Sequence, residues 1–163
     1  MISMDVDAYL ERINYNGSRD VNAETLRALQ VAHLLSVPFE NLSIHAGEPI
    51  VLDEDALFTK IVEQRRGGFC YECNGLFAGL LRALGFDVAM LAAGVAHATG
   101  GFGPIFDHMT LMVTLDERAA ENFGQLGFCL VVHGFLSKPA SSRRLIEMIG
   151  GRPEHLVFVE GEV

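Results

Sequence analysis

The most reactive side-chain type in the sequence lies within the segment RRGGFCYE, residues 65–72. Two consecutive glycines let the backbone turn sharply into a helix, which places Cys70 in or near the first helical turn. Unpaired N–H groups and the positive end of the helix dipole stabilise a thiolate there, as cysteine nucleophiles require. Cys70 is therefore a candidate nucleophile, and the alternative is an inert cysteine in the core.

A cysteine nucleophile needs a base, and the sequence contains six histidines. His108 is the best placed, because it follows a glycine-rich loop (residues 99–103) and Asp107 and opens a segment of alternating hydrophobicity. Cysteine and base are commonly far apart in sequence. The alternative is a histidine at the surface or one that is hydrogen-bonded in the core.

Cys70 and Cys73 form a Cys-x-x-Cys motif, which has two other interpretations. A thioredoxin-like redox pair should follow a strand, and here a helical segment precedes the motif. A zinc site needs two more regularly spaced ligands, and only an isolated Cys129 and scattered histidines remain. We therefore expect no metal, and we interpret Cys73 as part of an apolar stripe that continues to Phe77.

Glu40, in the segment PFENL, is a candidate for structural support. A buried carboxylate requires a cationic partner, and either Arg65 or Arg66 could supply it. Such a pair would hold the turn that presents Cys70. The alternative is a solvated glutamate in a loop.

The first half of the chain is predicted to be helical, and these helices must position the candidate residues. Apolar residues recur at helical spacing, and Asn22 and Asp53 are suited to cap two of the helices. The predicted helices run from Val6 to Ile13, from Asn22 to before Pro38, from Asp53 to Gly67 and from Cys70 to Gly85.

The second half has the periodicity of strands. Residues 88–95 form a continuous apolar run and residues 108–115 alternate, while residues 128–135 and 156–159 are further strand candidates. A short helix is predicted at residues 139–149. Helices followed by strands predict an α+β fold rather than alternating βαβ units.

The composition excludes several classes of function. A net charge of −9 without a basic block argues against nucleic acid and anionic membranes as partners. The chain has no apolar run of the roughly 18 residues that a membrane span needs, and its N-terminus has no signal pattern. Three cysteines, an odd count, favour a reducing compartment. We therefore expect a cytoplasmic protein, and 163 residues are typical of one domain.

Four blocks of the sequence resemble the arylamine N-acetyltransferases, in the same order and at the same spacing. They are residues 25–42, 65–72, 74–86 and 108–109, and RRGGFCYE followed by NGLF is a specific pattern. The resemblance covers residues from about Tyr9 to Leu115. It implies a helical first domain, a β-barrel second domain, an α/β third domain and an active site related to papain-like cysteine enzymes.

The resemblance fades after Leu115, and the chain ends at Val163, well short of the family's usual length. We therefore expect a helical bundle carrying the nucleophile at residues 1–86 and an antiparallel, β-barrel-like region at residues 87–163. In this interpretation the barrel is incomplete and the third domain is absent.

The resemblance implies a ping-pong acetyl transfer. Cys70 takes acetyl from the co-substrate acetyl-CoA as a thioester, with His108 as general base. An arylamine, arylhydrazine or N-hydroxyarylamine then attacks the thioester. Phe39 and Phe69 would contact the acceptor, and the backbone N–H of Cys70 would stabilise the oxyanion. The family's supporting ion pair would consist of Glu40 and Arg65.

The third catalytic residue departs from the family pattern. The family has an Asp in a stretch resembling WLVDVGFG, and the nearest match here, QLGFC, places Gln125 at that position. A Gln carbonyl can orient an imidazole but supplies no negative charge. Asp116, Glu117 or Glu121 could take this role if the register differs.

Two other functions are compatible with the same residues. One is a thiol hydrolase or transglutaminase-like enzyme that uses a Cys-His pair on another acyl donor. The other is a non-catalytic, truncated homologue that binds a partner, or forms a homo-oligomer to cover an incomplete barrel edge.

Overall fold

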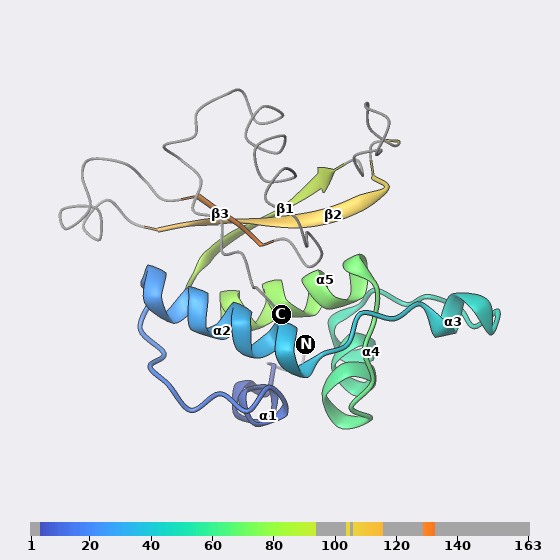
Figure 1. Ribbon diagram of the computed structural model, residues 1–163, viewed down its shortest axis with the longest axis horizontal. Coiled ribbons are helices and arrows are strands. Elements are labelled where there is room, and N and C mark those ends of the chain that lie inside the picture. Colours follow the sequence, from blue (N-terminus) through green and yellow to red (C-terminus); the bar gives the residue numbers. More distant parts are fainter. Residues whose placement is uncertain (1–3, 94–103, 105, 116–128, 133–163) are drawn as a thin grey trace. The chain divides into compact units, whose positions relative to one another are not determined.

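The computed structural model describes residues 4–93, 104, 106–115 and 129–132 and divides into two compact units, Met1–Phe86 and Asp87–Val163. Each unit is described by itself. The first contains α1 (Val6–Arg12), α2 (Ala23–Ser36), α3 (Leu42–His45), α4 (Glu54–Phe58), η1 (Thr59–Glu63) and α5 (Cys70–Ala83). The second contains β1 (Asp87–Ala93), β2 (His108–Thr114) and β3 (Cys129–Val132). The predicted α+β class is confirmed (Figure 1).

The side chains predicted to cap two helices do so. The Asn22 side chain accepts a hydrogen bond from the backbone N–H of Thr25 at 2.8 Å, at the start of α2. The Asp53 carboxylate accepts one from the N–H of Ala56 at 2.8 Å, at the start of α4. Each side chain satisfies a donor that the helix itself leaves unpaired.

The prediction of one continuous α-helix from Asp53 to Gly67 is wrong. The α-helical part, α4, ends at Phe58 and continues as a π-helical turn, η1, in which the N–H of Gln64 reaches back five residues to the carbonyl of Thr59 at 2.9 Å. Apolar spacing over so short a segment does not distinguish the two types of helix. The four-residue helix α3 was not predicted either, because no side chain caps it.

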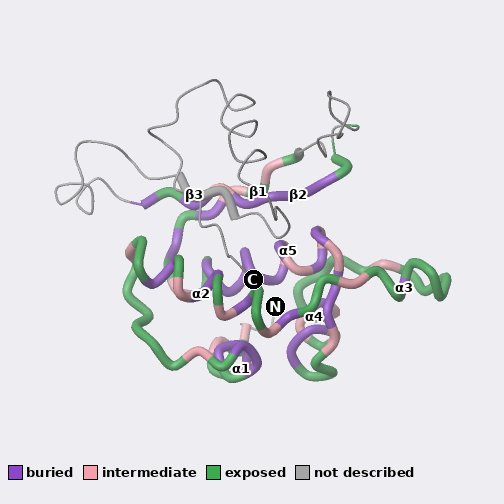
Figure 2. The backbone as a smooth tube through the Cα atoms, viewed as in Figure 1, coloured by how far each residue is buried: buried purple, intermediate pink, exposed green. Residues whose placement is uncertain are grey.

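Helix α5 is the centre of the first unit. It contacts α4 and α1, and it is buried over most of its length (Figure 2). Of the predicted apolar stripe, Phe77, Leu80 and Leu81 are fully buried, whereas its two ends, Cys73 and Leu84, are partly exposed. Burial of such side chains is the main source of stability for a helix of this length.

His33 of α2 is buried against this central helix. Its Nδ1 lies 3.0 Å from the hydroxyl of Tyr9, and its ring centroid lies 4.8 Å from that of Phe77. Burial lowers the pKa of His33 to about 3, and the charge of Arg12 adds to the effect. His33 is therefore a neutral core residue at physiological pH.

Acidification should destabilise the first unit through His33. The folded-state pKa of about 3 lies below the unfolded value of 6.5, so between them the unfolded chain binds the proton more tightly. Stability contributed by neutral His33 is intact above about pH 6.5, and about 2 kcal/mol of it should be lost at about pH 5. Urea titrations followed by far-UV circular dichroism at both pH values measure this loss.

A substitution of His33 by Leu should flatten this pH dependence, although it removes the bond to Tyr9 at every pH. The matched control is His45→Gln, because His45 is exposed in α3. If the His33→Leu and His45→Gln variants retained the same slope of stability against pH, the acid sensitivity would come from other groups.

The second unit contains an antiparallel sheet in the order β1-β2-β3. Val88 pairs with Val113, and Ala93 pairs with His108, so His108 opens the central strand opposite the last residue of β1. The strands predicted at 88–95 and 108–115 are confirmed, and β3 lies within the third predicted strand, 128–135.

The helix predicted at residues 139–149 and the strand predicted at 156–159 lie outside the described residues. The three described strands form an open sheet rather than a closed barrel. Within the described ranges, no helix is both long and apolar enough to cross a membrane.

Candidate active site

Cys70 is the first residue of α5, as predicted. Phe69 precedes it with extended backbone, and the N–H groups of Glu72 and Cys73 both bond to the Phe69 carbonyl, at 3.0 and 2.9 Å. Only 7% of Cys70 is exposed. The thiol of Cys70 is therefore nearly buried and lies in the first turn of α5.

A short parallel bridge brings Phe39 beside the turn that leads to Cys70. The N–H of Glu40 donates to the carbonyl of Gly68 at 3.0 Å, and the N–H of Gly68 donates to the carbonyl of Pro38 at 3.2 Å. Phe39 is half-exposed next to this bridge. The structure therefore brings the predicted acceptor-contacting residue Phe39 into the strand-like segment next to the chain that carries Phe69 and Cys70.

Gly67 is the residue on which this bridge depends. A Cβ atom at this position would lie 1.8 Å from the carbonyl oxygen of Pro38, so any side chain forces the two backbones apart. The glycine pair in RRGGFCYE thus serves a close approach of two chain segments as well as a sharp turn.

Substitution of Gly67 by Ala should raise the rate at which Cys70 is alkylated, because forcing the two backbones apart opens the surroundings of a thiol that is only 7% exposed. The rate of alkylation by iodoacetamide, measured by mass spectrometry, reports on the thiol without any substrate. Gly47→Ala is the control, since Gly47 has φ +70° and no neighbouring atom within 4 Å. Equal alkylation rates in both variants would show that the bridge does not position Cys70.

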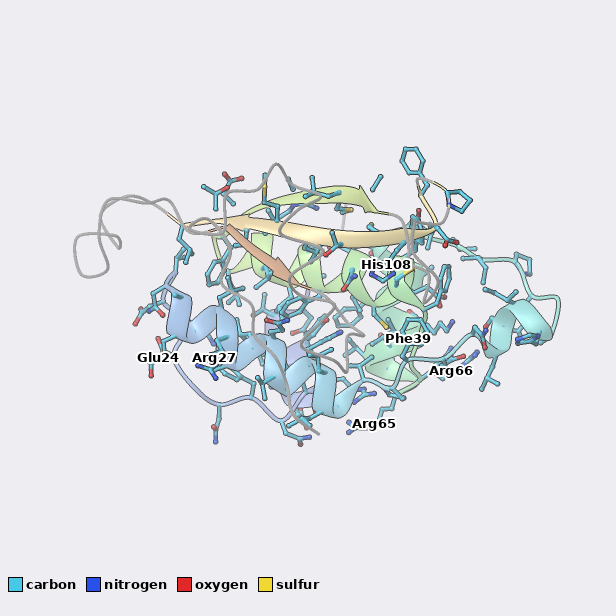
Figure 3. The ribbon with its side chains drawn as sticks, turned by 45° about the horizontal axis from the view of Figure 1, so that its top comes forward. Glu24, Arg27, Phe39, Arg65, Arg66 and His108 are labelled. Carbon is cyan, nitrogen blue, oxygen red and sulfur yellow. The ribbon has the colours of Figure 1, made fainter. Side chains whose placement is uncertain are left out.

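Glu40 forms the predicted supporting ion pair with Arg66 and not with Arg65. One of its carboxylate oxygens lies 3.2 Å from Nη2 of Arg66 and 3.8 Å from Nζ of Lys60, and the other accepts from the N–H of Leu42 at 2.6 Å. The Arg65 backbone has φ +55°, so the two adjacent arginines point in different directions (Figure 3). Arg65 contributes to the turn through its backbone.

Glu72 and Lys60 form a second ion pair, which the sequence analysis missed. Their closest N···O distance is 2.6 Å, and the other oxygen of Glu72 accepts from the N–H of Phe69 at 3.1 Å. Glu72 is buried, and its side chain packs directly against Gly68. A Glu at the third helical position is half of a capping box and could have indicated this contact. Lys60 neutralises the carboxylate two residues from Cys70.

Arg12, at the end of α1, is a second residue that the sequence analysis missed. Its guanidinium donates to the carbonyls of Ile61 and Ser36 at 2.8 Å each. It also donates to the carbonyls of Arg65 and Arg66 at 3.3 Å each. Arg12 is 5% exposed. Its position at the end of a short amphipathic segment gave no signal, because such residues usually face solvent.

Cys73 is chemically different from Cys70. Its thiol donates a hydrogen bond to the carbonyl of Gly68 at 3.1 Å. Burial, assisted by the neighbouring Glu72 carboxylate, raises the pKa of Cys73 to about 12. Cys73 is therefore a protonated thiol at neutral pH, which makes it a poor nucleophile.

His108 is buried at the start of β2. Burial lowers the pKa of His108, and the adjacent Asp107 carboxylate opposes that change. The imidazole is therefore neutral at physiological pH and able to accept a proton. His108 belongs to the second unit and Cys70 to the first. Gln125, like its alternatives Asp116, Glu117 and Glu121, lies outside the described residues.

The described part of the chain contains no group of three or more His, Cys, Asp or Glu side chains that could hold a metal ion.

The central helix of the first unit begins with a cysteine, and the central strand of the antiparallel sheet begins with a histidine. Comparison with known proteins identifies the class to which this chain belongs. Residues 22–123 match the family model described as N-acetyltransferase. The chicken arylamine N-acetyltransferase, pineal gland isozyme NAT-3, is 42% identical over 118 residues, 71% of this chain and 41% of that protein. The chain belongs to the arylamine N-acetyltransferase family.

Solved structures agree. The arylamine N-acetyltransferase of Nocardia farcinica is 44% identical, with a TM-score of 0.65 over 70% of this chain and 40% of that one. The Mycobacterium marinum enzyme in complex with CoA is 36% identical, with a TM-score of 0.64 over 78% of this chain and 46% of that one. The chain thus spans less than half the length of these relatives.

Proposed function

We propose that this protein transfers acetyl from acetyl-CoA to the nitrogen of an arylamine or arylhydrazine, through a thioester on Cys70. The observation that carries the proposal is the position of Cys70, the first residue of a buried helix, on a turn fixed by the Gly68 bridge and two ion pairs. Membership of the family and the CoA complex of a relative support acetyl-CoA as donor.

In this reaction the Cys70 thiol gives its proton to His108, and the sulfur attacks the acetyl carbonyl. The backbone N–H of Cys70 stabilises the resulting oxyanion. The C–S bond to CoA then breaks, and CoA leaves as a thiol with the proton from His108. The amine attacks the thioester next, its proton passes through His108, and the N-acetyl product leaves Cys70 free again.

His108 suits this role because its lowered pKa keeps the imidazole neutral and ready to take a proton. The carbonyl of Gln125 is the proposed partner that orients the imidazole, and Asp116, Glu117 and Glu121 are its alternatives. Phe39 and Phe69 contact the aromatic acceptor. The half-exposed Phe39 and the Phe69 ring, whose centroid is 5.8 Å from that of Tyr71, provide apolar surface beside Cys70.

We also propose which domains of the enzyme the two parts of this chain form. Residues 1–86 serve as the helical domain of a papain-like cysteine enzyme, and residues 87–163 contribute strands of its β-barrel. The protein acts in the cytoplasm on small molecules, without a metal.

Incubation with acetyl-CoA tests the proposal directly. Intact-mass spectrometry should show a gain of about 42 Da, one acetyl group, that peptide mapping places on Cys70. Addition of an arylhydrazine should remove this mass and release the acetylated acceptor. Hydrolysis of acetyl-CoA without transfer to an amine would favour the Cys-His hydrolase. An unmodified protein that elutes as an oligomer would favour the non-catalytic alternative.

A further inference from the structure

Two thiols of different character lie in the first turns of α5. Cys70 is the first residue of the helix and Cys73 the fourth, so both side chains lie on the same face. Helical geometry separates Cα atoms three residues apart by about 5 Å, which lies within the range that disulfides span. The Cys73 sulfur is directed back toward the start of the helix, where it bonds to the carbonyl of Gly68.

The two thiols also influence each other electrostatically. The charge of Cys70 is one of the contributions that raise the pKa of Cys73, which places the two groups within interaction range. Cys73 is protonated at neutral pH, so an oxidant that consumes thiolates does not react first at Cys73. Burial and the Glu72 carboxylate, which raise the pKa of Cys73 more, remain after Cys70 is oxidised, so Cys73 reacts only with a strongly electrophilic sulfur beside it.

We propose that Cys70 and Cys73 form a reversible oxidation site, in which a hydroperoxide converts the nucleophile into an intrahelical disulfide. The chemistry of the pair is independent of the proposed function, and only its consequence, the loss of acetyl transfer, rests on that function. Cys73 thereby protects Cys70 from irreversible oxidation.

Each step balances. The Cys70 thiolate attacks the terminal oxygen of the hydroperoxide, the O–O bond breaks, and protonation gives Cys70 sulfenic acid and an alcohol, or water from hydrogen peroxide. The Cys73 sulfur then attacks the sulfenic sulfur, the S–O bond breaks, and the hydroxyl leaves as water with the thiol proton of Cys73. A small dithiol reverses the reaction by thiol–disulfide exchange and restores both thiols.

The Cys73 thiol need only exchange its bond to the Gly68 carbonyl for the new S–S bond. This hydrogen bond lies between a weak donor and a backbone oxygen, and the same oxygen already accepts from the N–H of Glu40. The change therefore leaves no unsatisfied carbonyl at the turn.

Treatment of the full chain with hydrogen peroxide tests this site. The wild type should lose about 2 Da, map to a Cys70–Cys73 linkage and regain its mass with dithiothreitol. The Cys73→Ser variant should instead gain about 32 Da on Cys70, the irreversible sulfinic acid. Cys129→Ser is the matched control and should form the same linkage as the wild type.

A gain of about 32 Da on Cys70 in the wild type, at the same rate as in Cys73→Ser, would overturn the proposal. So would a linkage that involves Cys129. The acetyl-CoA incubation of the reduced protein is scored separately, so failure of acetyl loading leaves the disulfide result interpretable. If reduced protein loads acetyl, the oxidised protein should load none until dithiothreitol is added.

Discussion

Replacing Cys70 by Ser should abolish formation of the acetyl-enzyme and lower the rate of acetyl transfer by at least about a thousandfold. A serine hydroxyl at the start of α5 remains almost fully protonated at neutral pH, and His108 alone cannot make it as reactive as a thiolate. The measurements are intact mass after incubation with acetyl-CoA and the rate of acceptor acetylation.

Cys73→Ser is the matched control for this substitution. The serine hydroxyl can donate to the carbonyl of Gly68 as the thiol does, and Cys73 is too weakly acidic to attack the thioester of acetyl-CoA. This variant should load one acetyl group as the wild type does. Acetyl loading of Cys70→Ser, or its loss from Cys73→Ser alone, would move the nucleophile away from Cys70.

Replacing Arg12 by Leu should lower the free energy of unfolding by about 3–5 kcal/mol, because four carbonyls, reached by one buried and three part-buried hydrogen bonds, lose a charged donor at once. The carbonyls of Ile61 and Ser36 lose bonds of 2.8 Å, and two further carbonyls lose weaker ones. Urea unfolding followed by far-UV circular dichroism measures the change. Arg12→Lys should lose less, since an ammonium group can still reach part of this set.

The control for Arg12 is Arg19→Leu. Arg19 pairs with Asp7 at 2.6 Å, but its side chain is 54% exposed. Exposed pairs of this kind contribute less than about 1 kcal/mol. If Arg12→Leu lowered the free energy of unfolding no more than Arg19→Leu does, water would replace the guanidinium at these carbonyls. Arg12 would then not stabilise the turn that contains Arg65 and Arg66.

The parts of the fold that the sequence predicted are those set by neighbouring residues. Asn22 and Asp53 cap helices because their side chains reach N–H groups three residues ahead. The start of α5 at Cys70 follows from the glycine pair before it. Such contacts depend on short segments, so residue type and spacing are enough to identify them.

The parts that the sequence did not predict depend on contacts between distant segments. Arg65 and Arg66 are equivalent as residue types, and only the positive φ of Arg65 decides which one reaches Glu40. Lys60 of η1 pairs with Glu72 of α5, twelve residues further along the chain. The spacing of charged residues along a chain carries no information about such tertiary pairs.

The π-helical turn η1 has a consequence for how this segment tolerates changes in length. Each hydrogen bond of a π-helical turn spans five residues, one more than a hydrogen bond of an α-helix. Deletion of one residue within Thr59–Glu63 should therefore restore regular α-helical bonding instead of breaking the helix. The restored helix would rotate α4 by about 100° relative to Lys60. Either the apolar face of α4 or the cation beside Glu72 would then lose its partner on α5. The extra residue of η1 therefore allows both α4 and Lys60 to keep their partners on α5.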